Sequence, residues 1–143
     1  QKKYSRVSIE RVLSGPGLVD IYEFLKSATS EEEVELFDSP AHIVEKAIAK
    51  TSLNCEKTLK LFVSLYGALA GNLALQYLST GGVYLGGGIA PKVMPLLKEG
   101  DFMDAFLAKG RFKNVLSQIP VKVVMDETAP LLGAAQYAVG NIY

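Results

Sequence analysis

A run of three glycines directly after a short apolar strand constrains this chain more than any other feature of its sequence. Gly86, Gly87 and Gly88 follow the β-favouring segment 82–85 and precede Ile89-Ala90-Pro91-Lys92, which opens a short helix. Strand, glycine turn and helix in this order are typical of α/β proteins. Such glycines let the backbone approach a ligand closely, and the N–H groups of a following helix favour anions. The run matches neither Gly-x-Gly-x-x-Gly nor a P-loop, so a structural turn and a nucleotide site both remain open.

A second apolar strand is predicted near the end of the chain. Segment 120–125 is rich in β-branched residues and too apolar for an exposed strand. Two short helices are predicted before it, over 102–108 and 111–116, and a final helix after it, over 129–142. Apolar strands that alternate with helices pair in parallel within layered proteins. We therefore expect an α/β fold, with parallel strands and several packed helices.

The beginning of the chain is predicted to form two helices. Ser8 is a suitable N-cap for a helix start at Ile9-Glu10-Arg11, which the turn Ser14-Gly15-Pro16-Gly17 then ends. A second helix is predicted over 18–28 from the helical spacing of its apolar residues. Those residues are Leu18, Ile21, Tyr22 and Leu25. The stretch 29–37, with three adjacent glutamates at 31–33, is predicted to be a solvated loop.

Two more helix starts follow. Ser39-Pro40 indicates one, because serine suits the N-cap and proline suits the first helical position. The apolar face predicted for this helix consists of Val44, Ala47 and Ile48. Asn54 is predicted to cap a long helix that ends near Ser79-Thr80-Gly81.

This long helix includes a segment, 59–78, that has the length of a membrane span. Its polar residues lie on one helical face beside Ala68, which is typical of a largely buried helix in a soluble protein. They are Lys60, Ser64, Asn72 and Gln76. Gly67 and Gly71 repeat a small-xxx-small spacing, which favours close approach to a neighbouring element and leaves dimerisation as the alternative.

Composition excludes several classes of partner. The 143 residues suit one domain, with 49% hydrophobic and 21% charged residues. Because 15 Lys+Arg balance 15 Asp+Glu, no net field attracts nucleic acid or an anionic membrane. Cys55 is the single cysteine and no signal peptide is evident, so we expect a cytoplasmic protein. Gln1 in place of Met suggests a processed, tagged or excerpted chain.

Three isolated side chains are candidates for chemistry. Glu10 could accept hydrogen bonds from two neighbouring sugar hydroxyls, although its position is also that of an ordinary surface helix residue. His42, the only histidine, has no acid or nucleophile near it in sequence, and we predict a structural or exposed residue. Cys55 lies near a helix start, yet it has no partner histidine nearby, so a catalytic role is not expected. No metal site is predicted.

Six segments in order resemble bacterial glucokinases of the hexokinase/actin-like ATPase superfamily. The segments are Glu10-Arg11-Val12-Leu13-Ser14-Gly15-Pro16-Gly17-Leu18, Gly71-Asn72-Leu73-Ala74-Leu75, Gly82-Val83-Tyr84-Leu85-Gly86-Gly87-Gly88-Ile89-Ala90-Pro91, Lys109-Gly110-Arg111-Phe112, Ile119-Pro120-Val121 and Leu131-Leu132-Gly133-Ala134-Ala135. Together they span nearly the whole chain and are highly specific, although each alone is not. The resemblance implies a partial ribonuclease H-like/actin-like ATPase domain.

The resemblance also implies roles for particular residues. Glu10 matches the family's carboxylate that binds sugar hydroxyls near the anomeric carbon. The glycines at 86–88 match the adenosine motif, where backbone packs against adenine and ribose, and Ser14 and Gly15 match a turn that borders the nucleotide cleft. The helix with Gly67 and Gly71 matches the family's connecting helix, whose small residues let two domains hinge.

Other parts of the family pattern do not occur in this sequence: the Asp-Gly-Gly-Thr-type phosphate loop, the catalytic Asp after Asn, and the Glu-x-x-His sugar pair. We therefore expect residues 1–143 to be the carboxy-terminal, large-domain portion of a glucokinase, without catalytic residues or Mg²⁺ ligands and inactive alone. The complete enzyme would use ATP, Mg²⁺ and glucose and form a homodimer. The alternative is a sugar- or nucleotide-sensing or dimerisation module of the same fold that lacks catalysis.

Overall fold

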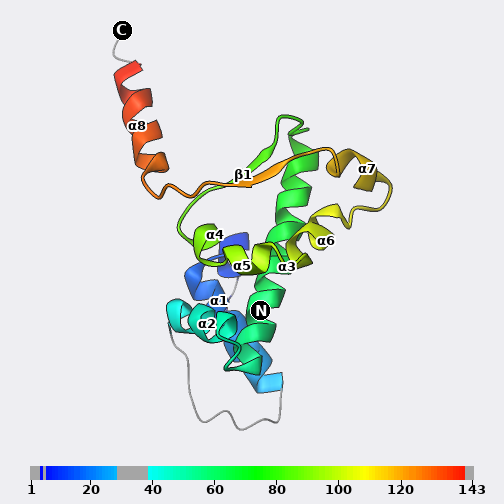
Figure 1. Cartoon of the computed structure of the whole chain (residues 1–143), viewed down its shortest axis with the longest axis vertical. Helices are drawn as coiled ribbons and strands as arrows, with labels where there is room; N and C mark the ends of the chain where they lie inside the picture. Colours follow the sequence, from blue (N-terminus) through cyan, green and yellow to red (C-terminus); the bar gives the residue numbers. More distant parts are fainter. Residues whose placement is uncertain (1–3, 5, 29–38, 141–143) are drawn as a thin grey trace.

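The computed structural model describes residues 4, 6–28 and 39–140 (Figure 1). Its helices are η1 (Ile9–Arg11), α1 (Gly15–Ala28), α2 (Pro40–Ile48), α3 (Leu53–Gln76), α4 (Ile89–Lys92), α5 (Met94–Leu97), α6 (Asp101–Leu107), η2 (Gly110–Phe112), α7 (Lys113–Leu116) and α8 (Ala129–Gly140). In this part of the chain, β1 (Val83–Leu85) and β2 (Val121–Val123) form a parallel pair. The loop predicted over 29–37 and the last two residues of the predicted final helix lie outside the described residues.

Helix α3 is the centre of the fold. Figure 1 shows it running through the body, with α1 and α2 around one end and α6 alongside, and these three helices make most of its contacts. Leu59, Phe62 and Val63 on α3 are buried against Tyr22 of α1 and Ile43 of α2. The helix is long and apolar enough to cross a membrane, yet 44% of its most apolar window is buried inside the protein. The expected polar stripe lies on its less buried face, so α3 is a core helix as predicted.

The cap of α3 differs from the prediction. The hydroxyl of Ser52 accepts a hydrogen bond from the Cys55 N–H at 3.2 Å, so Ser52 is the N-cap. Asn54 lies two positions further on, within the helix, and is fully buried. Both residues are good caps by type. The complete burial of Asn54 in the first turn of α3 depends on packing that its local sequence does not reveal.

The segment predicted as a turn at 14–17 is instead the start of α1. The Ser14 Oγ accepts a hydrogen bond from the Gly17 N–H at 3.0 Å, so Ser14 caps this helix. Pro16 fits the first turn because its missing N–H has no intrahelical partner there. The helix therefore begins at Gly15, three residues earlier than predicted, while its buried Leu18, Ile21 and Tyr22 confirm the predicted face.

Two other helix predictions need correction. The start at Ile9 is a single 3-10 turn, and the Ser8 side chain makes no capping hydrogen bond. In α2, Pro40 occupies the first position as predicted, but the buried residues are Ile43 and Ala47, whereas Ile48 is 42% exposed. The buried face is therefore formed by the i, i+4 pair Ile43 and Ala47. It lies one position earlier in the helix than the predicted pair Val44 and Ile48.

Gly67 and Gly71 let α6 lie directly on α3. A Cβ at Gly67 would collide with the carbonyl oxygen of Phe102, and one at Gly71 would collide with that of Phe106. The Lys109 ammonium also donates a hydrogen bond to the Ala68 carbonyl at 3.0 Å, which ties the end of α6 to the same stretch of α3. The predicted close approach is confirmed, and the hinge role stays a prediction.

The parallel pairing of the two strands is also confirmed. Val83 is opposite Val121 and Leu85 is opposite Val123, and the Val124 N–H donates to the Leu85 carbonyl at 3.0 Å. Leu85 is buried, but β2 has an exposed Lys122 between two half-buried valines. The prediction that segment 120–125 would not be exposed is thus only partly correct, because a sheet of two strands leaves one face uncovered in the described part of the chain.

The carboxyl end of α3 contains a backbone strain that predicts a stabilising substitution. Leu78 has a φ of 47° and is 70% exposed, and the following Ser79 N–H donates to the Ala74 carbonyl at 3.0 Å. This is the left-handed position that glycine prefers after a helix. We expect Leu78→Gly to raise the free energy of unfolding by about 0.5–1 kcal/mol in a denaturant titration. Tyr77→Gly is the control, because Tyr77 has a φ of −101°, which any residue adopts without strain. We expect this substitution to lower the free energy of unfolding by about 1 kcal/mol. Equal destabilisation by both substitutions would contradict this interpretation.

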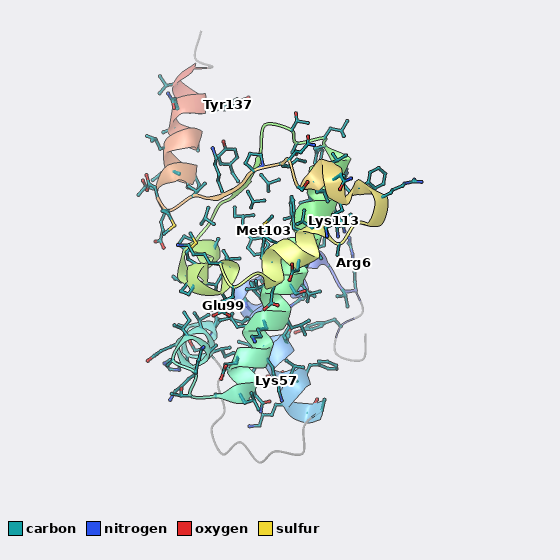
Figure 2. The ribbon with its side chains drawn as sticks, turned by 45° about the vertical axis from the view of Figure 1, so that its right-hand side comes forward. Arg6, Lys57, Glu99, Met103, Lys113 and Tyr137 are labelled. Atoms are coloured by element: carbon teal, nitrogen blue, oxygen red, sulfur yellow. The ribbon has the colours of Figure 1, made fainter. Side chains whose placement is uncertain are left out.

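Helix α8 extends away from the body of the molecule, as Figures 1 and 2 show; Tyr137 on this helix is labelled in Figure 2. None of its described residues is buried, although it contains no charged side chain. Leu131, Leu132 and Val139 are each at least 64% exposed. A helix that is apolar on all sides is ordinarily covered by other protein.

Candidate functional site

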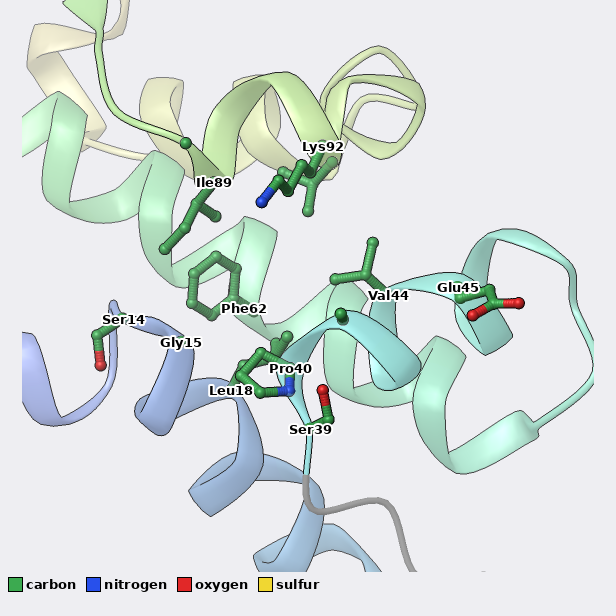
Figure 3. Close-up of a pocket in the computed structure, with 13 residues that line it drawn as sticks. Ser14, Gly15, Leu18, Ser39, Pro40, Val44, Glu45, Phe62, Ile89 and Lys92 are labelled. Carbon is green, nitrogen blue, oxygen red and sulfur yellow. The ribbon is translucent and has the colours of Figure 1, made fainter. Parts of the chain in front are cut away.

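An apolar cavity lies between α1, α2, α3 and α4 (Figure 3). Its volume is about 680 Å³. Apolar side chains form most of the wall, and Figure 3 shows the Phe62 ring at its centre with Leu18, Val44 and Ile89 around it. Its charged lining residues are Lys92, whose ammonium points into the space, and Glu45, whose carboxylate points away. An apolar cavity of this kind suits a flat, weakly polar ring system.

A second cavity of about 380 Å³ adjoins the first. The two cavities share Phe62, Gly88 and Ile89. Glu10 and all three glycines of the turn line the second cavity. The structure thus brings together Glu10 and the glycines at 86–88, which are more than seventy positions apart in the sequence.

The glycine turn has an open backbone on the cavity side. Gly87 has a φ of 90°, which only glycine adopts without strain. No heavy atom of the described residues lies within 4 Å of a Cβ placed at Gly86 or Gly87, so the missing side chains leave open space there. Gly88 is the N-cap of α4, but α4 has only four residues. The accessible backbone is therefore what this turn offers a ligand, and the expected attraction of anions by the helix start has little basis here.

Glu10 is positioned by the packing of η1 on α1. A Cβ at Gly17 would come within 2.8 Å of the Arg11 carbonyl oxygen, so glycine is required for this approach. The Tyr4 hydroxyl donates a hydrogen bond to the Asp20 carboxylate at 2.8 Å, and the Arg11 guanidinium lies 4.3 Å from the centre of the Tyr4 ring. These contacts hold η1 in place while Glu10 itself remains exposed. The carboxylate can therefore accept hydrogen bonds from the hydroxyl groups of a ligand.

Ser14 and Gly15 border the larger cavity, together with Gly88 on its other side. The Ser14 Oγ already accepts the capping hydrogen bond from Gly17. Its contribution to the cavity is therefore to form the wall and to fix the start of α1. Five of the predicted residues, Ser14, Gly15, Gly86, Gly87 and Gly88, are divided between two cavities that meet at Gly88.

His42 and Cys55 lie outside these cavities. His42 is exposed on α2, in agreement with the prediction. Cys55 is completely buried in the core, so its thiol is not accessible to a ligand. In residues 4, 6–28 and 39–140 there is no group of three or more His, Cys, Asp or Glu side chains that could hold a metal ion.

Sequence reasoning missed several residues that form the site. Phe62 lines both cavities, Pro40 and Val44 line the larger one, and Tyr66 lines the other. The helical spacing placed Phe62 and Tyr66 within a core helix, but it gave no sign that this helix also forms a cavity wall. Lys92 follows the glycine turn by four positions, and that proximity was the one available indication of its place in the site.

Comparison with known proteins supports one family. The Glucokinase family model matches residues 1–141. A glucokinase from Synechocystis sp. is 41% identical over 94% of this chain and 44% of its own length, and one from Psychromonas ingrahamii is 44% identical over 92% of this chain and 40% of its own. A crystal structure of a glucokinase from an Antarctic psychrotroph superimposes with a TM-score of 0.80 at 34% identity, over 94% of this chain and 41% of that one.

The chain spans less than half the length of these relatives. The match covers more than nine-tenths of this chain, and the structural agreement confirms the predicted actin-like ATPase fold with its parallel strands and packed helices. The chain therefore belongs to the glucokinase family.

Proposed function

We propose that the complete protein transfers the γ-phosphoryl group of Mg·ATP to the 6-hydroxyl of glucose, and that residues 1–143 are its carboxy-terminal, large-domain portion. The observation that supports this most is the pair of adjoining cavities, one apolar and one with an exposed carboxylate, that meet at the glycine turn. A kinase must hold two substrates side by side so that one oxygen faces the phosphoryl group.

The larger cavity is the proposed adenosine site. Its apolar wall around Phe62 suits the adenine ring, and the backbone at 86–88 can approach the ribose because no side chain intervenes. Ser14 and Gly15 form the opposite border. From Gly88 the phosphate chain would extend toward the second cavity.

The second cavity is the proposed glucose site. An ionised carboxylate accepts hydrogen bonds from neighbouring sugar hydroxyls, and charge-assisted bonds of this kind are roughly twice as strong as neutral ones. Glu10 lies at this cavity and is held there by the packing of η1 on α1. We assign no catalytic base and no Mg²⁺ ligand to the described residues. Mg²⁺ would arrive with the ATP phosphates.

The complete protein would be cytoplasmic and would close over glucose, which excludes water from the phosphate. The small residues of α3 at positions 67 and 71 would permit this closure. A homodimer is also proposed, because the uncharged, exposed helix α8 offers an apolar surface.

Gly86→Val tests the nucleotide site. A Cβ at Gly86 meets no protein atom within 4 Å, so we expect valine to leave the free energy of unfolding within about 0.5 kcal/mol of the original value. The added side chain would occupy space that the ribose needs. We expect the KM for ATP of the complete protein to rise at least about tenfold while the KM for glucose changes little.

Gly81→Val is the matched control for this substitution. Gly81 also has no neighbour within 4 Å of a Cβ, and it lies outside both cavities. Its variant should keep the original KM for both substrates. An unchanged KM for ATP in Gly86→Val would mean that the glycine run is a structural turn only.

The second candidate is a module of the same fold that senses sugar or nucleotide, or that dimerises, without catalysis. The exposed apolar side chains of α8 favour this candidate, since they fit a binding surface as well as an enzyme. Binding of glucose and ATP by the complete protein without formation of glucose 6-phosphate would support it over the kinase.

A further inference from the structure

The cavity of about 380 Å³ that Glu10 shares with the glycine turn has one other polar side chain among the described residues that line it. Among the described residues that line it, Ile9, Leu13, Phe62, Leu69 and Ile89 are apolar and three are glycines, which leaves Glu10 and Tyr66. A carboxylate accepts hydrogen bonds, whereas a phenol can also donate one. A polyhydroxylated ligand needs both kinds of partner, because each of its hydroxyls donates one hydrogen bond and accepts others.

The Tyr66 ring is held firmly in place. It lies in the middle of α3 and makes edge-to-face contacts with Phe62 and Phe102, with ring centres 6.3 Å and 5.6 Å apart. Phe102 belongs to α6, and this helix packs directly on α3 because Gly67 has no side chain. A side chain fixed by two aromatic neighbours loses little further freedom when it binds a ligand.

No hydrogen bond joins the Tyr66 hydroxyl to another residue in the described part of the chain. Burial raises the pKa of Tyr66, because the ionised phenolate is poorly solvated there. The hydroxyl therefore keeps its proton throughout the neutral range. A protonated, fixed and unpartnered phenol in a cavity is a hydrogen-bond donor that is available to a ligand.

We propose that Tyr66 is a second sugar-contacting residue, which donates a hydrogen bond to an oxygen of the hexose held by Glu10. This inference rests on the proposed function, since it takes glucose to be the ligand of that cavity. Glu10 would accept from the sugar on one side while Tyr66 donates to it from α3. Loss of the donor leaves a desolvated sugar hydroxyl without its partner, which weakens binding more than the loss of an exposed contact does.

Tyr66→Phe in the complete protein tests the proposal, because it removes one oxygen and keeps both aromatic contacts. We expect the KM for glucose to rise by about three- to tenfold, with little change in the KM for ATP. Tyr77→Phe is the control, since Tyr77 directly follows α3, is 72% exposed and lies outside the cavity. The free energies of unfolding of both variants should remain close to that of the original protein.

Monodeoxyglucose analogues separate a direct contact from a structural effect. If Tyr66 binds one hydroxyl, the effect of Tyr66→Phe should disappear for the analogue that lacks this hydroxyl and persist for the others. A glucose KM within twofold of the original, or a change in the KM for ATP instead, would overturn the role of Tyr66. If Glu10→Gln raises the KM for glucose in the same series while Tyr66→Phe does not, only this inference fails; if neither does, the proposed glucose site fails with it.

Discussion

Replacing Gly67 with alanine is expected to destabilise the protein by about 3 kcal/mol, the upper part of the range for overpacking a core. A Cβ at this position would collide with the backbone carbonyl of Phe102, and backbone cannot move aside as a flexible side chain can. Helix α6 would have to shift away from α3, and the buried Phe102 and Phe106 would lose contacts with it. A urea titration followed by circular dichroism measures the change.

Gly133→Ala is the control for this prediction. Gly133 lies in α8, and no heavy atom is within 4 Å of a Cβ placed there. Alanine favours a helix over glycine by about 1 kcal/mol, so this variant should be equally stable or slightly more stable. If Gly67→Ala were as harmless as Gly133→Ala, the close approach of α6 would not be a determinant of the fold.

Replacing Glu10 with glutamine in the complete protein is expected to lower kcat/KM for glucose about 100-fold. The amide keeps the shape of the side chain but loses its charge and one acceptor, and hydrogen bonds to charged groups contribute about 1.5–3 kcal/mol each. The KM for ATP should change far less, because Glu10 does not line the larger cavity. Steady-state kinetics with each substrate varied in turn provide the measurement.

Glu99→Gln is the matched control. Glu99 is exposed after α5 and lies outside the cavities that contain Glu10. Its variant should keep the original kinetics for both substrates. A normal glucose KM in Glu10→Gln would remove Glu10 from the sugar site, whatever the identity of the complete protein.

Local sequence patterns predicted much of the fold because their physical causes are local. The order of strand, glycine turn and helix at 83–92 needs only β-favouring residues, glycines and a proline in the right places. The polar stripe and the paired glycines of α3 follow from the helical repeat alone. The parallel pairing of β1 and β2 followed from a helical connection between two apolar strands.

Errors arose where a residue type fits more than one structural position. Ser14, Pro16 and Gly17 suit a turn and also the first helical turn, and the hydrogen bond from Gly17 to the Ser14 hydroxyl decides between them. Asn54 is completely buried in the first turn of α3, and this burial, which leaves Ser52 as the cap, depends on the packing of the whole fold. Such long-range packing has no signature in the neighbouring residues.

The candidate site likewise combines residues that the sequence indicated with residues that only the structure reveals. The resemblance to the family indicated Glu10 and the glycines, and the structure places them around one cavity. Phe62 and Tyr66 escaped notice because an aromatic residue on a helix's apolar face is ordinarily part of the core. Only the three-dimensional arrangement shows that these two rings border open space as well as packed side chains.

The most direct test of the central proposal is ³¹P NMR of the complete protein incubated with Mg·ATP and glucose. We expect the γ-phosphorus signal of ATP to fall while a sugar phosphate signal rises at the same rate, and neither signal to change when glucose is omitted. An ATP spectrum that stays constant in the presence of glucose, or the appearance of inorganic phosphate without a sugar phosphate, would contradict it.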